Sequence, residues 1–155
     1  MSPKTMAVRP FAVTKGEGRL LDVFGVRIEV LVHAADTGGD LSTYYIECNR
    51  GEGAPDHVHF RINEAFYVLD GEFDVRTGDK VVRAGAGTQV VIPRDTPHNF
   101  TCVSETGTML GMSFPGGHDV FFEAADELLR TGRFNPETGA ELCRAHDTEL
   151  LPPLA

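Results

Sequence analysis

Residues 51–71 read GEGAPDHVHFRINEAFYVLDG, and this stretch decides the fold. His57 and His59 are two residues apart, so on a β-strand both imidazoles point to the same face. Glu64 lies five residues further on, at the start of the strand-like run EAFYVLDG. If the chain bends after Phe60, we expect a hairpin that returns the Glu64 carboxylate to the two imidazoles.

A later stretch, GTQVVIPRDTPHNFTC at residues 87–102, supplies a third histidine. His98 opens a strand-like run directly after the turn sequence PRDTP. Three imidazoles and one carboxylate suit Fe, Ni, Mn, Zn, Co or Cu, and they leave one or two coordination positions for water or substrate. The candidate ligands of one divalent transition-metal ion are therefore His57, His59, Glu64 and His98.

The glycines of these stretches, and their spacing, resemble the signature of the cupin superfamily. Gly51, Gly71 and Gly87 stand where turns are expected. Tight turns often require a positive φ, and glycine adopts it at little conformational cost. The first cupin motif, G-x5-H-x-H-x4-E-x6-G, is matched in full by residues 51–71. The second, G-x5-P-x-G-x2-H-x3-N, is matched by residues 87–102 except that Asp95 replaces its Gly and Cys102 its Asn. Asp tolerates a left-handed turn, so the first replacement is compatible with the motif.

This resemblance implies an all-β fold, a cupin double-stranded β-helix or jelly-roll barrel, with the metal ion inside. It makes His57, His59, Glu64 and His98 the four ligands. A likeness to quercetin dioxygenase-like cupins further implies that Glu64 is catalytic, as a general base beside the ion. Two alternatives stay open: the histidines are polar groups that bind no metal, or the ion is purely structural.

Strand alternation predicts the residues of a substrate pocket. Phe66 and Val68 share the face of Glu64, and Phe100 and Cys102 share the face of His98. Such an apolar lining suits an aromatic or otherwise nonpolar small molecule. Alternatively, these side chains only fill the barrel.

Histidines and cysteines outside the motifs are given no chemical role. The remaining histidines are interpreted as solvated or loop residues: His33, His118 and His146. An odd number of cysteines favours reduced thiols in a cytoplasmic setting, and each is interpreted as a buried structural thiol: Cys48, Cys102 and Cys143.

The remaining pattern predicts one domain over residues 1–155, with a barrel at about 20–115 and a helical segment at about 118–148. Short β-rich runs alternate with glycine-centred turns, among them a hairpin turn at 77–79. After residues 115–117, apolar pairs four residues apart indicate a helix with Asp119 as N-cap and Gly132 as its stop. A second helix is expected from Pro136 to about residue 146. These helices would cover one barrel face or form a subunit contact, and we expect a homodimer.

Composition excludes several classes of partner. The net charge is −9, from 14 Lys+Arg and 23 Asp+Glu, without a basic stripe, so neither nucleic acid nor an anionic membrane is expected as a partner. No apolar run approaches the roughly 18 residues that span a bilayer, and Met1 to Arg9 contain no apolar core of a signal peptide.

The leading hypothesis for function is a mononuclear metal-dependent, dioxygenase-like oxidoreductase that acts on a small aromatic or phenolic compound. Glu64 would take the proton of a phenol or enol, the oxyanion would bind the ion, and O2 would attack the activated ring. The alternatives are a non-redox cyclase or isomerase acting on a polyketide-like substrate, and a small-molecule binding protein without turnover. Fold alone does not decide between them.

Overall fold

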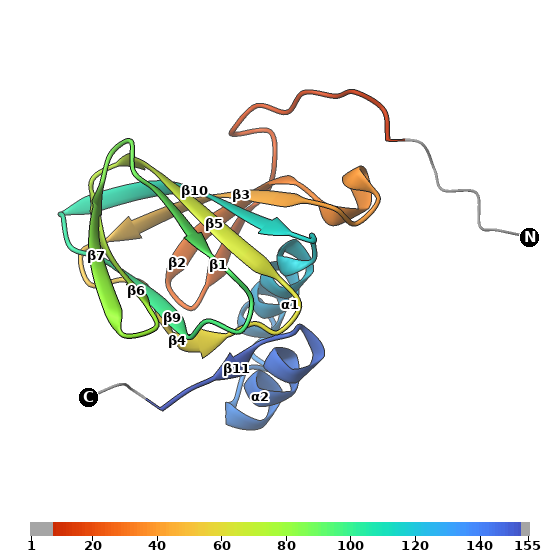
Figure 1. Ribbon diagram of the computed structural model, residues 1–155. Helices are drawn as coiled ribbons and strands as arrows, with labels where there is room; N and C mark the ends of the chain where they lie inside the picture. The colour runs from red at the N-terminus through yellow and green to blue at the C-terminus, as the bar shows by residue number, and fades with distance from the viewer. Residues whose placement is uncertain (1–7, 153–155) are drawn as a thin grey trace, which may run out of the picture.

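The computed structural model describes residues 8–152, so residues 1–7 and 153–155 of the predicted domain lie outside the described residues. Eleven strands in this part form two antiparallel sheets that face each other as a jelly roll (Figure 1), which confirms the predicted fold class. The first sheet has the order β1 (Leu20–Val23), β2 (Val26–Val32), β3 (Ser42–Asn49), β10 (Thr106–Phe114), β5 (Asn63–Asp70) and β8 (Gln89–Ile92). The second has the order β11 (Glu149–Leu150), β4 (Gly53–Val58), β9 (His98–Cys102), β6 (Glu72–Thr77) and β7 (Lys80–Gly85).

Both sheets bury alternate residues, as half-buried strands do. In β3 the buried side chains include Tyr44 and Ile46, and in the paired strand β10 they include Met109. Phe73 and Val75 of β6 reach the same core from the second sheet. The lumen between the sheets is therefore closed by apolar side chains over much of its length, and the candidate metal ligands lie toward one end.

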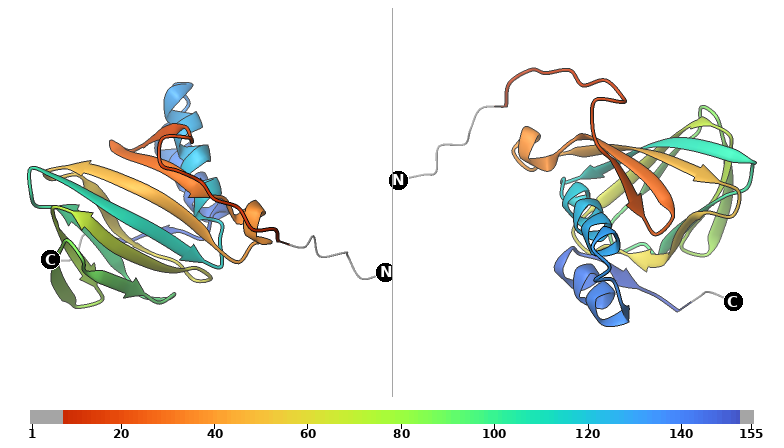
Figure 2. Two further views of the ribbon diagram at one scale, coloured as in Figure 1. Left: turned by 90° about the horizontal axis from the view of Figure 1, so that it is seen from above. Right: turned by 180° about the vertical axis from the view of Figure 1, so that it is seen from behind.

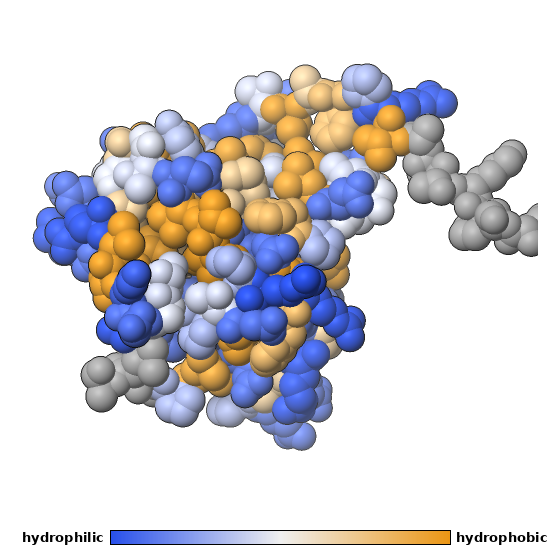
Figure 3. Space-filling view, in the orientation of Figure 1, coloured by the Kyte–Doolittle hydropathy of each residue, from blue (hydrophilic) through white to orange (hydrophobic). Residues whose placement is uncertain are grey.

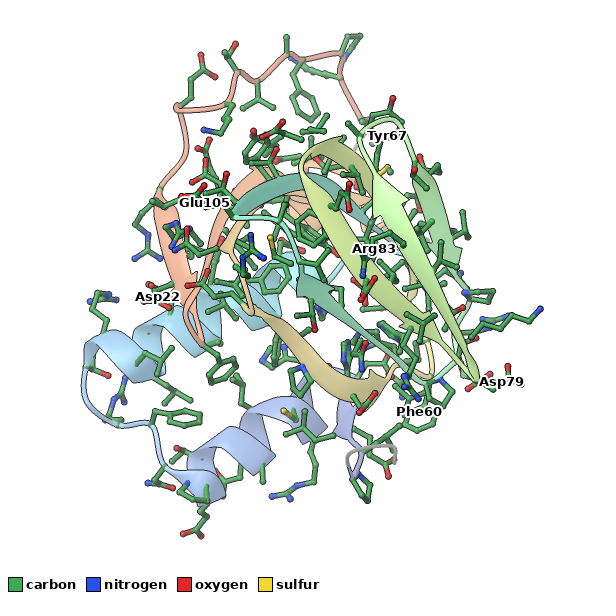
Figure 4. The ribbon with its side chains drawn as sticks, turned by 90° about the vertical axis from the view of Figure 1, so that its left-hand side faces the viewer. Asp22, Phe60, Tyr67, Asp79, Arg83 and Glu105 are labelled. Atoms are coloured by element: carbon green, nitrogen blue, oxygen red, sulfur yellow. The ribbon has the colours of Figure 1, made fainter. Side chains whose placement is uncertain are left out.

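That end of the barrel is shaped by tight connections. Phe60, in the connection after β4, and Asp79, in the β6–β7 turn, lie at this end in Figure 4, whereas Glu105 marks the opposite end. The two-residue β6–β7 turn confirms the predicted hairpin. Asp95 adopts φ 66°, the left-handed conformation that the cupin motif reserves for glycine, and its amide donates to the carbonyl of His59. The replacement of glycine at 95 therefore leaves the turn intact.

The connection from β4 to β5 differs from the expected hairpin. The strand β4 pairs with β9 and β11, while β5 pairs with β10 and β8 in the opposite sheet. The bend after Phe60 therefore carries the chain across the barrel. Glu64 faces the histidines from the opposite sheet, a relation between layers that residue spacing does not reveal.

Two helices lie outside the barrel beside the β1–β2 hairpin and β4 (Figure 2): α1 (His118–Arg130) and α2 (Pro136–Ala145). Pro136 occupies the first turn of α2, and Gly132, with φ 68°, follows the end of α1, as predicted. The N-cap of α1 is Gly117, so the assignment of Asp119 was wrong; Asp119 lies inside the first turn, where its acidic side chain suits the helix dipole. A short 3-10 turn, η1 (Ala34–Thr37), lies between β2 and β3.

The surface carries apolar side chains over β5, β7 and β8, visible as an orange area in Figure 3. Its exposed members are Tyr67, Leu69, Val81, Val82 and Val91. Within residues 8–152, neither helix has the length and apolar character needed to cross a membrane.

Candidate metal centre

The four candidate ligands come together from both sheets. His57 lies near the end of β4, directly opposite His98 at the start of β9. The two residues are register partners. His59 follows β4 by one residue, and Glu64 lies on β5 in the facing sheet. All four side chains are buried, and one ligand atom from each lies within 4.8 Å of all the others.

The carboxylate of Glu64 is the centre of this cluster. Its Oε1 lies 2.7 Å from Nε2 of His59, 3.1 Å from Nε2 of His98 and 4.0 Å from Nε2 of His57. Three Nε2 atoms and one carboxylate oxygen thus converge on one small volume. This is a ligand set of borderline character with a single negative charge.

Backbone carbonyls hold the other nitrogen of each ring. Nδ1 of His57 lies 2.7 Å from the carbonyl of Pro55, and Nδ1 of His98 lies 2.8 Å from that of Thr96. Nδ1 of His59 lies 2.8 Å from a carbonyl in the C-terminal part of the chain. Because a carbonyl only accepts, each Nδ1 carries the proton, and in the neutral ring Nε2 presents its lone pair to the cluster.

The cluster fits a divalent metal ion. Nε2 of His59 is buried, and despite its short distance to Glu64 it has no aligned hydrogen-bond partner among the described residues. Three lone pairs aimed at a carboxylate oxygen repel one another unless a cation or proton lies between them. An ion bound to the three nitrogens and the carboxylate would satisfy every one of these atoms.

Asp147 completes the support of His59 from the far end of the chain. Its carbonyl is the acceptor for Nδ1 of His59, across 88 residues of sequence. Its carboxylate accepts the amides of Phe60, Arg61 and Ile62 at 3.0, 2.8 and 3.1 Å, which fixes the bend after the ligand. Asp147 itself adopts φ 54°, a left-handed conformation that Asp tolerates.

Tyr44 supports Glu64 in a similar way. Its buried hydroxyl donates to Oε2 of Glu64 at 2.9 Å, which leaves Oε1 toward the imidazoles. The ring fits because its register partner on β10 is Gly111, where a Cβ would overlap the Tyr44 ring. Motif spacing gave no sign of Tyr44 or Gly111, since neither lies in the two motifs.

Burial keeps two of the buried histidines neutral. Burial lowers the pKa of His57 to about 4, and the nearby His98 adds to this effect. Burial likewise lowers the pKa of His118 to about 3. Both rings are therefore uncharged at neutral pH.

The His59–Glu64 pair behaves differently. Burial opposes a charge on His59, but the Glu64 carboxylate outweighs it and raises the pKa of His59. Burial would also favour neutral Glu64, yet the surrounding histidines His118, His59 and His98 hold the pKa of Glu64 well below its usual range. Glu64 is thus ionised, and without metal the raised pKa of His59 favours a proton on its Nε2.

An apolar cavity of about 450 Å³ leads to the cluster. His57 and Glu64 line it together with Phe66 and Phe100, two of the predicted pocket residues. The other two, Val68 and Cys102, are buried but do not border the cavity, so they fill the barrel. Further lining side chains come from the β1–β2 hairpin, the two helices and the loop between them: Val23, Phe24, Val26, Ile28, His118, Phe121, Phe122, Phe134, Ala140 and Cys143.

The structure places the three histidines outside the motifs in different environments. His33 is half-buried and pairs with Glu123 at 2.9 Å, and His146 is half-buried at the end of α2. The interpretation of His118 as a solvated residue was wrong, because it is 5% exposed and lines the cavity. All three cysteines are buried and unpaired, as predicted.

Chelation is expected to lower the Tm more at about pH 7.5 than at about pH 5.5. An ion that binds only the folded protein raises its stability, and protons compete for Nε2 of His59 as the pH falls through the imidazole range near 6.5. The measurement is the Tm with and without chelator at both pH values, with metal content determined in parallel. If the chelator removes the metal but leaves the Tm unchanged at both pH values, the coupling between metal binding and stability is contradicted.

The metal-free protein is expected to lose stability as the pH falls from about 6.5 to about 4. In this window the unfolded chain takes up protons at His57 and His118, with pKa values near 6.5, while the folded protein keeps both rings neutral. The raised pKa of His59 acts mainly above this window, between its folded value and about 6.5, and therefore leaves the predicted loss in place. A Tm that rises on acidification over this range would contradict the assignment of buried neutral rings.

Comparisons with known proteins agree with this geometry. A family model described as a cupin domain matches residues 44–113. The chain is 30% identical over 115 residues to quercetin 2,3-dioxygenase of Bacillus subtilis (strain 168), which covers 73% of this chain and 34% of the relative. The chain therefore spans about a third of the length of that curated relative.

Solved structures share the fold. KdgF from Halomonas sp. matches with a TM-score of 0.66 and 22% identity, over 72% of this chain and 99% of that one. The polyketide cyclase RemF from Streptomyces resistomycificus matches with a TM-score of 0.59 and 19% identity, over 69% of this chain and 80% of that one. At these sequence identities the similarity shows a shared fold and nothing about function.

Proposed function

The chain belongs to the cupin family, and on that premise we propose that it is a mononuclear metal-dependent oxidoreductase of dioxygenase type that acts on a small aromatic or phenolic compound. One observation carries the proposal: three Nε2 atoms and a carboxylate oxygen converge where an apolar cavity of about 450 Å³ ends. A cavity of this size and lining suits a small, flat, largely apolar molecule. The quercetin dioxygenase relative supports the choice of reaction class.

In such a reaction, different residues of the chain would have different roles. An ion held by His57, His59, Glu64 and His98 would supply Lewis acidity and, if redox-active, a route for electrons to O2. Glu64 is ionised and borders the cavity, so its carboxylate can accept the proton of a phenol or enol. The Tyr44 hydroxyl keeps that carboxylate oriented through Oε2.

The aromatic side chains position the substrate and exclude water. Phe66 and Phe100 contact each other from the two sheets, with ring centroids 5.5 Å apart. Phe121 and Phe122 of α1 close the cavity from the side of the helices. A flat ring between these groups would be held by apolar and aromatic contacts, so its hydroxyl must find its polar partners at the metal end.

The test is O2 uptake by protein reconstituted separately with each of the six candidate metals. Flavonols, simple phenols and enols form the panel, and the expected result is metal-dependent uptake of O2 in proportion to substrate consumed. Turnover of polyketide-like substrates without O2 uptake would instead identify a cyclase or isomerase. Tight binding of a panel member without any product would identify a binding protein, and either result would overturn the oxidoreductase proposal.

A further inference from the structure

The cavity holds a polar side chain that the metal cluster does not use. Its lining contains five hydrogen-bonding side chains apart from the weakly polar thiol of Cys143: Tyr44, His57, Glu64, His118 and Thr148. Two of them belong to the ligand set. Tyr44 donates its hydroxyl to Glu64, and the hydroxyl of Thr148 donates to the carbonyl of His146 at 3.1 Å. Four of the five are therefore committed within the protein.

His118 is the exception. Its Nδ1 is buried and has no hydrogen-bond partner among the described residues. The contacts of its ring are with other rings, stacked on Phe121 at 5.2 Å and edge-on to Phe122 at 4.5 Å. A buried imidazole nitrogen without a partner loses the hydrogen bond that it makes to water in the unfolded chain, and this loss is unfavourable. A ligand in the cavity that His118 lines can replace this hydrogen bond.

The position of His118 says which part of a ligand it would meet. Its ring centroid lies 4.8 Å from that of His59, a candidate metal ligand, and 6.0 Å from that of Tyr44. It therefore stands at the metal end of the cavity, beside the cluster and Tyr44. A polar group reaching His118 must sit close to the atom of the ligand that meets the ion.

We propose that His118 is a specificity-determining residue that binds a second polar substituent, next to the oxygen that meets the metal ion, on an aromatic substrate. The inference rests on the proposed function, since it presumes a phenolic or enolic ligand at that centre. It narrows the substrate class to aromatic compounds with two neighbouring oxygen functions. His118 hydrogen-bonds the second oxygen, while Phe121 and Phe122 hold the ring of the imidazole in place.

The experiment compares two probes that differ by one hydroxyl group, 2-naphthol and 2,3-dihydroxynaphthalene. Their Kd values are measured calorimetrically with zinc-loaded wild type, His118→Phe and a control, Phe100→Leu, which lies in the same cavity lining. Zinc prevents redox turnover, so binding is read without catalysis. His118→Phe is expected to reduce the preference for the diol by about three- to tenfold, the effect of one lost hydrogen bond. Phe100→Leu removes apolar contact with the probes at a position whose ring contacts are with Phe66 and Phe73, and it should weaken both probes alike.

Each of the other outcomes overturns a stated part of the proposal. An unchanged preference in His118→Phe overturns the role of His118 and leaves the phenolic class standing. Failure of both probes to bind the wild type overturns the phenolic class and the inference with it. If His118→Phe does not fold, nitrogen NMR of the wild-type imidazoles decides: the His118 ring signals should shift with the diol and not with 2-naphthol, and equal spectra overturn the proposal.

Discussion

Replacing Glu64 with Gln is expected to reduce turnover by about 10² to 10⁴, the usual effect of losing a general base. The amide keeps the shape of the side chain and one oxygen toward the imidazoles, so metal is retained at least in part. It has neither the negative charge nor the capacity to take the substrate proton. The measurement is kcat per bound metal ion, with metal content determined on the same preparation.

A second buried glutamate provides the matched control. Glu29 is 5% exposed and accepts the amides of Gly16 and Gly18, far in sequence from the metal ligands. Glu29→Gln should alter stability while leaving turnover per metal ion unchanged. Full turnover in Glu64→Gln with metal bound would show that Glu64 is a ligand only, or has no part in the reaction.

Replacing His59 with Ala is expected to abolish metal retention, whereas the wild type should hold close to one ion per chain. Loss of a group that merely orients a ligand costs roughly 10- to 100-fold in affinity, so loss of the ligand should cost at least about 100-fold. The alanine also leaves a gap in the coordination shell and removes the partner of the Asp147 carbonyl. Elemental analysis after dialysis and a competition assay with a chelator measure the effect.

The control for this substitution is His33→Ala. His33 is half-buried and pairs with Glu123 rather than with the cluster, so its loss should leave metal content unchanged. Equal metal content in wild type and His59→Ala would refute the assignment of the cluster. A wild type that retains almost no metal after supplementation would refute it equally.

The sequence predicted the parts of the fold that local spacing encodes. The spacing of the histidines, Glu64 and the turn glycines indicated the barrel and the four side chains that the structure brings together, and Asp95 adopted the left-handed turn expected of it. Alternation placed Phe66 and Phe100 on the cavity correctly but could not say how deep along the barrel each residue lies. Val68 and Cys102 therefore satisfied the same pattern while lying away from the cavity.

Besides Tyr44, two residues beside the cluster were missed for different reasons. His118 lies three and four residues before Phe121 and Phe122, on the apolar stripe of its helix, so this spacing could have shown that it is buried. Asp147 carried no such signal. Its contact with His59 spans 88 residues, and only the paired strands β11 and β4 bring the two together.

The long-range contact of Asp147 also has a consequence for the order of synthesis. A ribosome builds the chain from the N-terminus, so all four ligands exist once residue 98 has been added. The carbonyl that orients His59, and the carboxylate that fixes the bend behind it, arrive with residue 147. A nascent chain thus displays all four side chains of the cluster before Asp147 can orient His59. The support of His59 is complete only after translation has passed residue 147.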